Sequence, residues 1–279
     1  MRQHRPGESS MNLQPQNWRT LKRHYRHGLR IFADTVWPPA CQGCGQPGEH
    51  VAGELCGNCM AAVGPAMALD YCPGCGRTVA PFELNEVGCG VCRAEGRPFA
   101  RVFRTAAYHG GFAEVFRRYK YVGHENLELF LARNLAREIF QSECYDDVDV
   151  LVPVPTCWQH RLRRNLQSSG QAFHPAEGLA RLLSKHTSIP YAPLLNRIRG
   201  GRSQVGLSFT ARLENVRGKF RLARGCQVAG GRVCIVDDIM TTGATVRECA
   251  KVLRRARASA VYVAVVARAG EDAASLNLV

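Results

Sequence analysis

Hydrophobic residues in the second part of the chain alternate between short continuous runs and helical stripes. The continuous runs predict buried strands at 149–154, 232–236 and 261–267. Apolar residues spaced three and four positions apart predict helices at 112–122, 126–140, 171–184 and 244–257. Strands and helices that alternate in this way are typical of an α/β domain with a parallel sheet, built here around a right-handed βαβ unit at 232–267.

The first hundred residues follow a different pattern. Residues 1–16 are polar and predicted to be disordered, whereas residues 17–36 carry an apolar stripe that predicts an amphipathic helix with a basic outer face. Residues 41–92 are rich in Cys and Gly and lack long apolar runs. Such a segment cannot bury enough apolar surface to fold unaided, so it needs a bound metal or a covalent cross-link. We therefore expect a basic extension, a small Cys-rich domain, an α/β domain and a tail, at residues 1–36, 37–100, 101–270 and 271–279.

Eight of the thirteen cysteines form four C-x-x-C pairs that make an internal repeat. The pairs are Cys41/Cys44, Cys56/Cys59, Cys72/Cys75 and Cys89/Cys92. In a reducing compartment this spacing predicts two zinc ions, and four thiolates per ion leave no open position, so we expect both ions to be structural. A redox motif and an iron–sulfur cluster are the alternatives. The repeat favours sequential sets of four cysteines over a cross-braced arrangement.

The overall composition narrows the class of protein. No apolar run is long enough for a membrane span, and the first 30 residues contain no signal-peptide core, so we expect a cytoplasmic protein. The net charge is +14, densest at residues 19–30 and 161–164. Such a charge either attracts phosphate, nucleic acid or anionic lipid, or reflects an arginine-rich composition on a solvated surface.

Residues 233–246 (VCIVDDIMTTGATV) carry the clearest chemistry in the chain. A buried strand runs into Asp237 and Asp238, and buried carboxylates are costly unless a ligand such as a sugar hydroxyl engages them. The small residues that follow, with Gly243 at their centre, let backbone N–H groups surround a phosphate at the start of a helix. A helix cap beside a Thr-rich turn is the alternative, but it explains only one of the two acids. We expect the two carboxylates to lie near one another and to repel.

This segment resembles the signature that binds phosphoribosyl pyrophosphate (PRPP) in type I phosphoribosyltransferases, and it matches at every position. Further motifs are the four C-x-x-C pairs, Val152-Pro-Val-Pro155, Gln204-x-x-Leu207, Arg212-x-x-Asn215-Val216 and Phe220. Their order resembles the ComF family over roughly residues 30–268. The chain departs from that family at Arg163–Ser168, where relatives usually show Arg-Gly-Phe-Asn-Gln.

The resemblance implies a type I phosphoribosyltransferase fold, a parallel sheet flanked by helices, behind a double zinc ribbon. It implies an enzyme that transfers a pentosyl group from PRPP to an acceptor. The implied ligand is PRPP or a nucleoside monophosphate, and Mg²⁺ would arrive bound to PRPP. Asp237 and Asp238 are the implied catalytic pair and bind the ribose hydroxyls. The implied contacts of the 5′-phosphate and pyrophosphate are Thr241, Thr242, Gly243, Ala244, Thr245, Val154 and Pro155.

A second class of function is also open. The family's link to competence favours an accessory protein of DNA uptake that binds single-stranded DNA and uses the fold as a nucleotide-binding scaffold. The basic helix at 17–36 and the zinc ribbon agree with this hypothesis. Five basic side chains either contact a ligand or lie on a solvated surface. They are Lys120, Arg197, Arg199, Arg202 and Arg212.

Overall fold

The computed structural model describes residues 40–47, 55–80, 82–122, 125–155, 174–198 and 216–269. The predicted basic helix at 17–36 and the tail at 271–279 lie outside these ranges. The described elements are, in chain order, α2 (Gly57–Met67), α3 (Gly90–Glu95), β1 (Val102–Ala107), α4 (Gly110–Val122), α5 (Glu125–Phe140), β2 (Val150–Pro153), α7 (Pro175–Thr187), β3 (Leu195–Arg197), β4 (Phe220–Leu222), β5 (Arg232–Met240), α9 (Ala244–Arg255) and β6 (Ala260–Arg268).

Four of the strands form one parallel sheet in the order β1-β6-β5-β2. Its central strands β5 and β6 are apolar and nearly continuous, as expected for strands that are buried on both faces. The predicted strands and the parallel sheet are therefore confirmed. The sequence did not predict β1, because Arg104 and Thr105 interrupt its apolar run, yet both residues are buried.

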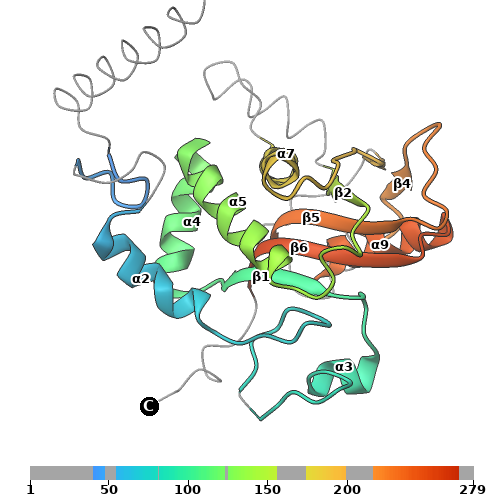
Figure 1. Cartoon of the computed structure of the whole chain (residues 1–279), viewed down its shortest axis with the longest axis horizontal. Helices are drawn as coiled ribbons and strands as arrows, with labels where there is room; N and C mark the ends of the chain where they lie inside the picture. The colour runs from blue at the N-terminus through green and yellow to red at the C-terminus, as the bar shows by residue number, and fades with distance from the viewer. Residues whose placement is uncertain are drawn as a thin grey trace, which may run out of the picture.

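The two faces of the sheet are covered by different helices (Figure 1). Helices α4, α5 and α7 contribute to one core, together with Cys234 and Val236 of β5. Helix α9 and the β3–β4 hairpin contribute to the other core, together with Val233 and Ile235. Because α7 follows β2 and α9 follows β5, the chain turns to opposite faces after two neighbouring strands.

Two boundaries differ from the prediction in ways that matter for the site. Strand β5 does not end at Val236 but continues through both acids to Met240, because it keeps pairing with β6 up to Arg268. The β3–β4 hairpin was not predicted; it pairs Leu195–Arg197 with Phe220–Leu222, and residues 199–215 between these strands lie outside the described ranges.

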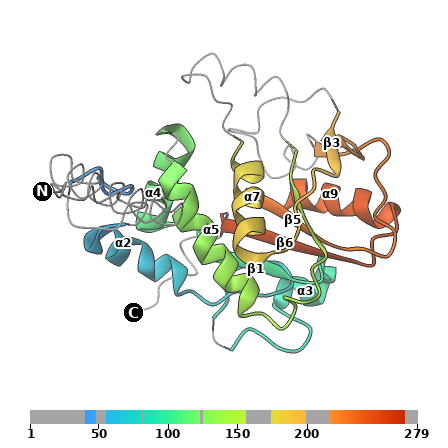
Figure 2. The same cartoon turned by 45° about the horizontal axis from the view of Figure 1, so that its top comes forward.

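The Cys-rich region attaches to the sheet domain at two places. Helix α2 lies along α4, as Figures 1 and 2 both show, and buries Val63 and Ala66 in the first core. The segment around the third C-x-x-C pair lies against β1. There Val102 donates its backbone N–H to the carbonyl of Pro73 at 2.6 Å.

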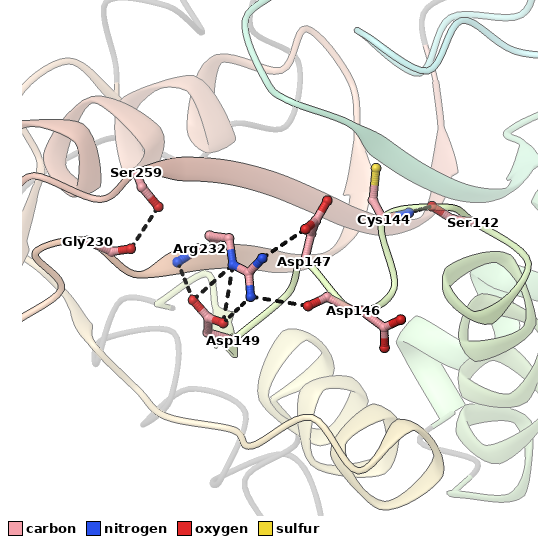
Figure 3. Close-up of polar contacts among 8 residues, drawn as sticks. All are labelled: Ser142, Cys144, Asp146, Asp147, Asp149, Gly230, Arg232 and Ser259. Atoms are coloured by element: carbon pink, nitrogen blue, oxygen red, sulfur yellow. Dashed lines mark hydrogen bonds and ion pairs between the residues drawn. The ribbon is translucent and has the colours of Figure 1, made fainter.

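The amino end of β5 is closed by an ion-pair cluster (Figure 3). Arg232 Nη1 lies 2.8 Å from Asp147 Oδ1, and its Nη2 lies 2.9 Å from Asp149 Oδ1. The backbone N–H of Arg232 also donates to Asp149 Oδ2 at 2.8 Å. Since Asp149 immediately precedes β2, these bonds fix the start of β2 beside the start of β5.

Candidate functional site

The carboxyl ends of β5 and β2 lie side by side and bring the predicted site residues together. Val154, directly after β2, donates its backbone N–H to the carbonyl of Val236 at 2.9 Å. The Val154 side chain is buried and Pro155 is partly exposed. Asp237, the next residue after Val236, therefore lies beside the Val154–Pro155 segment that the sequence assigned to the pyrophosphate.

Asp237 and Asp238 lie within β5 and belong to opposite faces of the sheet. Side chains alternate along β5 from Val233 to Val236, so Asp237 follows on the α9 face and Asp238 on the α4 face, before the pattern shifts at Ile239 and Met240. Their electrostatic neighbours agree. Burial is the main cause that raises the pKa of Cys249 on α9 and of Tyr119 on α4. The negative charge of Asp237 raises the pKa of Cys249 further, and the charge of Asp238 does the same for Tyr119.

The sequence predicted that the two carboxylates lie near one another and repel; on opposite faces of a strand, neighbouring side chains point away from one another. Each accepts a hydrogen bond from the next backbone N–H, from Asp238 N to Asp237 Oδ1 at 2.9 Å and from Ile239 N to Asp238 Oδ1 at 2.7 Å. Both side chains remain partly exposed at the edge of the sheet. A ligand over the end of β5 can therefore meet one carboxylate from each face.

The segment from Thr241 to Thr245 connects β5 to α9 and leads into the N-terminus of that helix. Gly243 is the N-cap of α9 with φ of +75°, a conformation that favours glycine. The Thr242 hydroxyl accepts a hydrogen bond from the backbone N–H of Ala244 at 3.2 Å. The helix α9 begins at this loop, so the positive end of its dipole faces it. No acidic residue in the first turn of α9 offsets that partial charge.

Two buried polar residues that the sequence did not predict border the Asp238 side of the site. Tyr119 Oη donates to Glu128 Oε1 of α5 at 3.1 Å, and both side chains are at most 9% exposed. Burial first, and then the charges of Glu128 and Asp238, raise the pKa of Tyr119 well above its usual value. The signal in the sequence was a glutamate within the apolar stripe of a predicted helix.

The eight paired cysteines form two sets of four, Cys41/Cys44/Cys56/Cys59 and Cys72/Cys75/Cys89/Cys92. Within each set all sulfur atoms lie within 4.8 Å of one another, so the structure supports sequential sets and not the cross-braced arrangement. A tetrahedral zinc with Zn–S bonds of about 2.3 Å requires sulfur atoms about 3.8 Å apart. The sulfur atoms of Cys44 and Cys56 are 3.8 Å apart, and those of Cys75 and Cys89 are 3.6 Å apart.

Backbone amides in the second set favour the thiolate that a metal requires. Hydrogen bonds from the Cys75 thiol first, and then from the backbone N–H groups of Cys89, Gly74 and Cys75, lower the pKa of Cys72 to about 4, although burial opposes them. The corresponding N–H donors to Cys41 in the first set come from Gly43 at 3.3 Å and Cys56 at 3.2 Å. Both sets therefore fit structural zinc.

Several predicted residues cannot be placed. The Arg163–Ser168 segment, three of the four arginines (Arg199, Arg202 and Arg212) and the side chain of Lys120 lie outside the described residues. The fourth arginine, Arg197, lies over the ring of Phe220, with 5.6 Å between the guanidinium carbon and the ring centroid. That contact gives Arg197 a packing role in the β3–β4 hairpin.

Two regions of the chain match the models of known families. Residues 171–276 match the model of the phosphoribosyl transferase domain, and residues 32–94 match that of the double zinc ribbon domain. The chain therefore has the fold predicted from its sequence, a phosphoribosyltransferase domain behind paired zinc ribbons. Across the residues that the structure describes, no helix combines the length and apolar character that a membrane span requires.

Two relatives are similar to the chain over most of their length. The chain is 29% identical to DNA utilization protein YhgH of Salmonella typhimurium over 230 residues, which cover 81% of this chain and 95% of that protein. It is 26% identical to Competence protein F of Haemophilus influenzae over 226 residues, or 79% and 93% of the two chains. These relatives confirm the resemblance that the order of the motifs predicted.

Among solved structures, the chain is similar to an allosteric regulatory enzyme of purine biosynthesis. The identity is 29%, the TM-score is 0.33, and the match covers 50% of this chain but only 25% of that structure's chain. Because that TM-score is low, the fold is assigned from the parallel sheet and the domain match.

Proposed function

We propose that this chain, with its phosphoribosyl transferase domain behind two zinc ribbons, binds PRPP with Mg²⁺ over the carboxyl end of β5 and transfers its phosphoribosyl group to an acceptor. The observation that carries the proposal is the position of the Thr241–Thr245 loop. It joins the N-terminus of α9 directly to the strand that bears Asp237 and Asp238. One continuous segment thus offers a phosphate site beside two acceptors for hydroxyl groups.

The path of the chain around this edge supports a ligand site. In open α/β sheets, ligands bind outside the carboxyl ends of strands where neighbouring connections turn to opposite faces. The helices that follow β2 and β5 do so here, since α7 lies on one face and α9 on the other. Val154 and Pro155 at the end of β2 then face the pyrophosphate of a ligand whose 5′-phosphate lies at Gly243.

The proposed residues do distinct parts of the chemistry. Asp237 and Asp238 accept hydrogen bonds from the ribose hydroxyls and place their negative charge near C1 as it becomes electron-deficient. The backbone N–H groups from Thr241 to Thr245 hold the 5′-phosphate and so fix the ribose. Mg²⁺ bound to PRPP supplies neutralising charge to the departing pyrophosphate. The C1–oxygen bond to pyrophosphate breaks, a bond from C1 to the acceptor nucleophile forms, and that nucleophile loses a proton.

Isothermal titration of the full chain with PRPP and Mg²⁺ tests the binding step. Ribose 5-phosphate should bind more weakly and compete with PRPP, because it carries the ribose and 5′-phosphate without the pyrophosphate. We expect 2-deoxyribose 5-phosphate to bind about tenfold more weakly than ribose 5-phosphate, since it lacks one hydroxyl for the acidic pair. Absence of any heat with PRPP at millimolar concentration would reject the proposal.

The second candidate function is single-stranded nucleic acid binding, and two observations favour it. The relatives are named for DNA utilization and competence, and the chain has a net charge of +14. On this proposal the basic segment at 1–36 contributes phosphate contacts. Its deletion should flatten the salt dependence of binding to a single-stranded oligonucleotide, because fewer counterions are released. Binding with an unchanged salt slope would exclude that segment, and PRPP turnover would favour the first function.

Structural zinc is the common premise of both functions, and we propose one ion in each set of four cysteines. Protein purified without added metal should contain close to two zinc ions per chain by elemental analysis. A Cys72→Ser, Cys75→Ser variant should lose one of them and should destabilise the second ribbon, since metal binding supplies folding free energy to such a small domain. Iron, or a folded Cys-rich region without metal, would contradict this assignment.

A further inference from the structure

The two zinc ribbons contain equivalent glycines whose surroundings differ. Gly45 and Gly76 each follow a C-x-x-C pair, with φ of +76° and +74°. A Cβ on Gly45 would have no atom within 4 Å. A Cβ on Gly76 would lie 2.9 Å from Val102 Cγ1, 3.0 Å from Met240 Cε and 3.6 Å from Arg268 Cδ. The turn of the second ribbon therefore presses against the carboxyl end of the central strands, whereas the described surroundings of Gly45 are open.

The second ribbon is held in this position by β1. Arg104 is 1% exposed, and its Nη1 donates to the carbonyl of Gly76 at 3.0 Å and to Thr78 Oγ1 at 2.9 Å. The guanidinium also lies over the ring of Tyr71, 4.8 Å from its centroid. A buried guanidinium with several acceptors fixes the groups around it, because loss of any one bond leaves a costly unsatisfied charge. The glycine turn is thus fixed relative to the sheet.

Two of the three residues that contact Gly76, Met240 and Arg268, also lie beside Gly243 in the Thr241–Thr245 loop. A Cβ on Gly243 would lie 3.5 Å from Met240 Sδ and 3.8 Å from Arg268 Nη1. The side chain of Arg268 therefore extends from the zinc-ribbon turn at its Cδ to the N-cap of α9 at its guanidinium. Arg268 is the last residue of β6 and is 4% exposed. Arg247 approaches Gly243 from α9, with its Nε 3.7 Å from the same Cβ position.

We propose that Arg268 is a further anion-binding residue of the phosphate site, and that the second zinc ribbon positions it through Gly76. The inference rests on the proposed function, because the anion it assigns to Arg268 is the 5′-phosphate of PRPP. A guanidinium removed from water interacts strongly with a nearby anion, since the effective dielectric there is low. The zinc at Cys72, Cys75, Cys89 and Cys92 then supports ligand binding without contacting the ligand. The first ribbon contacts the sheet domain elsewhere, through α2 and through the hydrogen bond from Arg118 of α4 to the carbonyl of Gly43.

A charge-matched pair of variants tests the anion contact. Arg268→Met removes the charge and retains an apolar stem, whereas Arg255→Met removes an exposed arginine from the last turn of α9. Isothermal titration with PRPP and Mg²⁺ should show affinity reduced by roughly 10- to 100-fold for Arg268→Met, the loss expected for a charge-assisted hydrogen bond, and parental affinity for Arg255→Met. Arg268→Lys should recover part of the loss. Equal affinity of the two methionine variants would overturn the assignment.

The equivalent glycines test the link to the ribbon. Gly76→Ala and Gly45→Ala share the cost of a positive φ, so the contacts with Val102, Met240 and Arg268 distinguish them. Hydrogen exchange of the free protein should be several-fold faster at residues 241–247 in Gly76→Ala than in Gly45→Ala, with two zinc ions retained in both. Equal exchange in these variants would refute the link. Should Gly76→Ala lose zinc, Val102→Ala replaces it in the comparison, because Val102 contacts Gly76 but not Gly243 and lies outside the ribbon sequence.

The exchange measurement separates this inference from the proposed function. It needs no ligand, so it tests the link even if the parent protein fails to bind PRPP. Failure of PRPP binding in the parent rejects the proposed function and, with it, the assignment of Arg268 to the 5′-phosphate. PRPP binding with parental affinity in Arg268→Met rejects the Arg268 assignment alone.

Discussion

The two ends of strand β5 carry similar side chains in opposite arrangements. At the amino end, Asp147 and Asp149 are bonded to the guanidinium of Arg232 at 2.8 and 2.9 Å (Figure 3). At the carboxyl end, Asp237 and Asp238 accept hydrogen bonds from adjacent backbone N–H groups and turn to opposite faces of the sheet. Acids at the first end join two strands, whereas we propose that acids at the second end bind a ligand. On this proposal the same residue type is structural or functional according to its neighbours.

The largest expected effect comes from removing the two acids at the carboxyl end. Asp237→Asn with Asp238→Asn keeps the shape of both side chains and removes their charge. Affinity for PRPP and Mg²⁺ should fall by about 100-fold or more, because two charge-assisted bonds to hydroxyls are weakened. The melting temperature should change little, since both side chains are partly exposed at the edge of the sheet. Isothermal titration and thermal melting measure the two effects.

The matched control removes the two acids at the amino end. Asp147→Asn with Asp149→Asn changes the net charge equally, but should lower the melting temperature and leave PRPP affinity intact. If both double variants lost affinity equally, a general effect of charge would explain the result and the two ends of β5 would not differ in function.

A second comparison uses glycines at the two ends of the strand. Gly243 and Gly230 have φ of +75° and +76°, so alanine costs about 1 kcal/mol of stability at either position. Only Gly243→Ala should also weaken PRPP binding, by about tenfold, because it shifts the backbone N–H groups that surround the phosphate. Titration of both variants with ribose 5-phosphate checks this difference. Equal affinities would place the phosphate elsewhere.

Features of the fold and the site were predictable where they depend on residues close together in the sequence. The parallel strands, the α9 stripe and the paired cysteines were predictable, because periodicity and spacing are local signals. Strand β1 was not, because Arg104 reads as a polar interruption until its acceptors at Gly76 and Thr78 are known. The positions of Tyr119, Glu128 and Arg268 near the site also depend on contacts between segments far apart in the chain, for which a single sequence gives no signal.

A smaller effect is expected from Arg232 at the amino end. Arg232→Met leaves Asp147 and Asp149 without their shared cation and loosens the start of β2 against β5. The melting temperature should fall by about 2–4 °C, because the pairs are half-exposed and partly screened by solvent. PRPP affinity should not change. A loss of affinity without a loss of stability would show that the two ends of β5 are coupled.

The smallest effect concerns the pH dependence of Asp149. Hydrogen bonds from the Arg232 side chain, and then from its backbone N–H, hold the pKa of Asp149 below its usual value of 3.8. A carboxyl with a depressed folded-state pKa stabilises the protein fully above the unfolded value, and this contribution is lost as the pH falls through the folded pKa. Asp149→Asn should therefore lower the melting temperature by about 1–2 °C, and equally so, from pH 7 down to pH 5. The difference should begin to shrink only near pH 4 and below. Thermal melting of parent and variant at each pH cancels any loss of zinc that both share. Shrinkage already between pH 7 and pH 5 would assign the titration to another group and remove Asp149 from the closed end of β5.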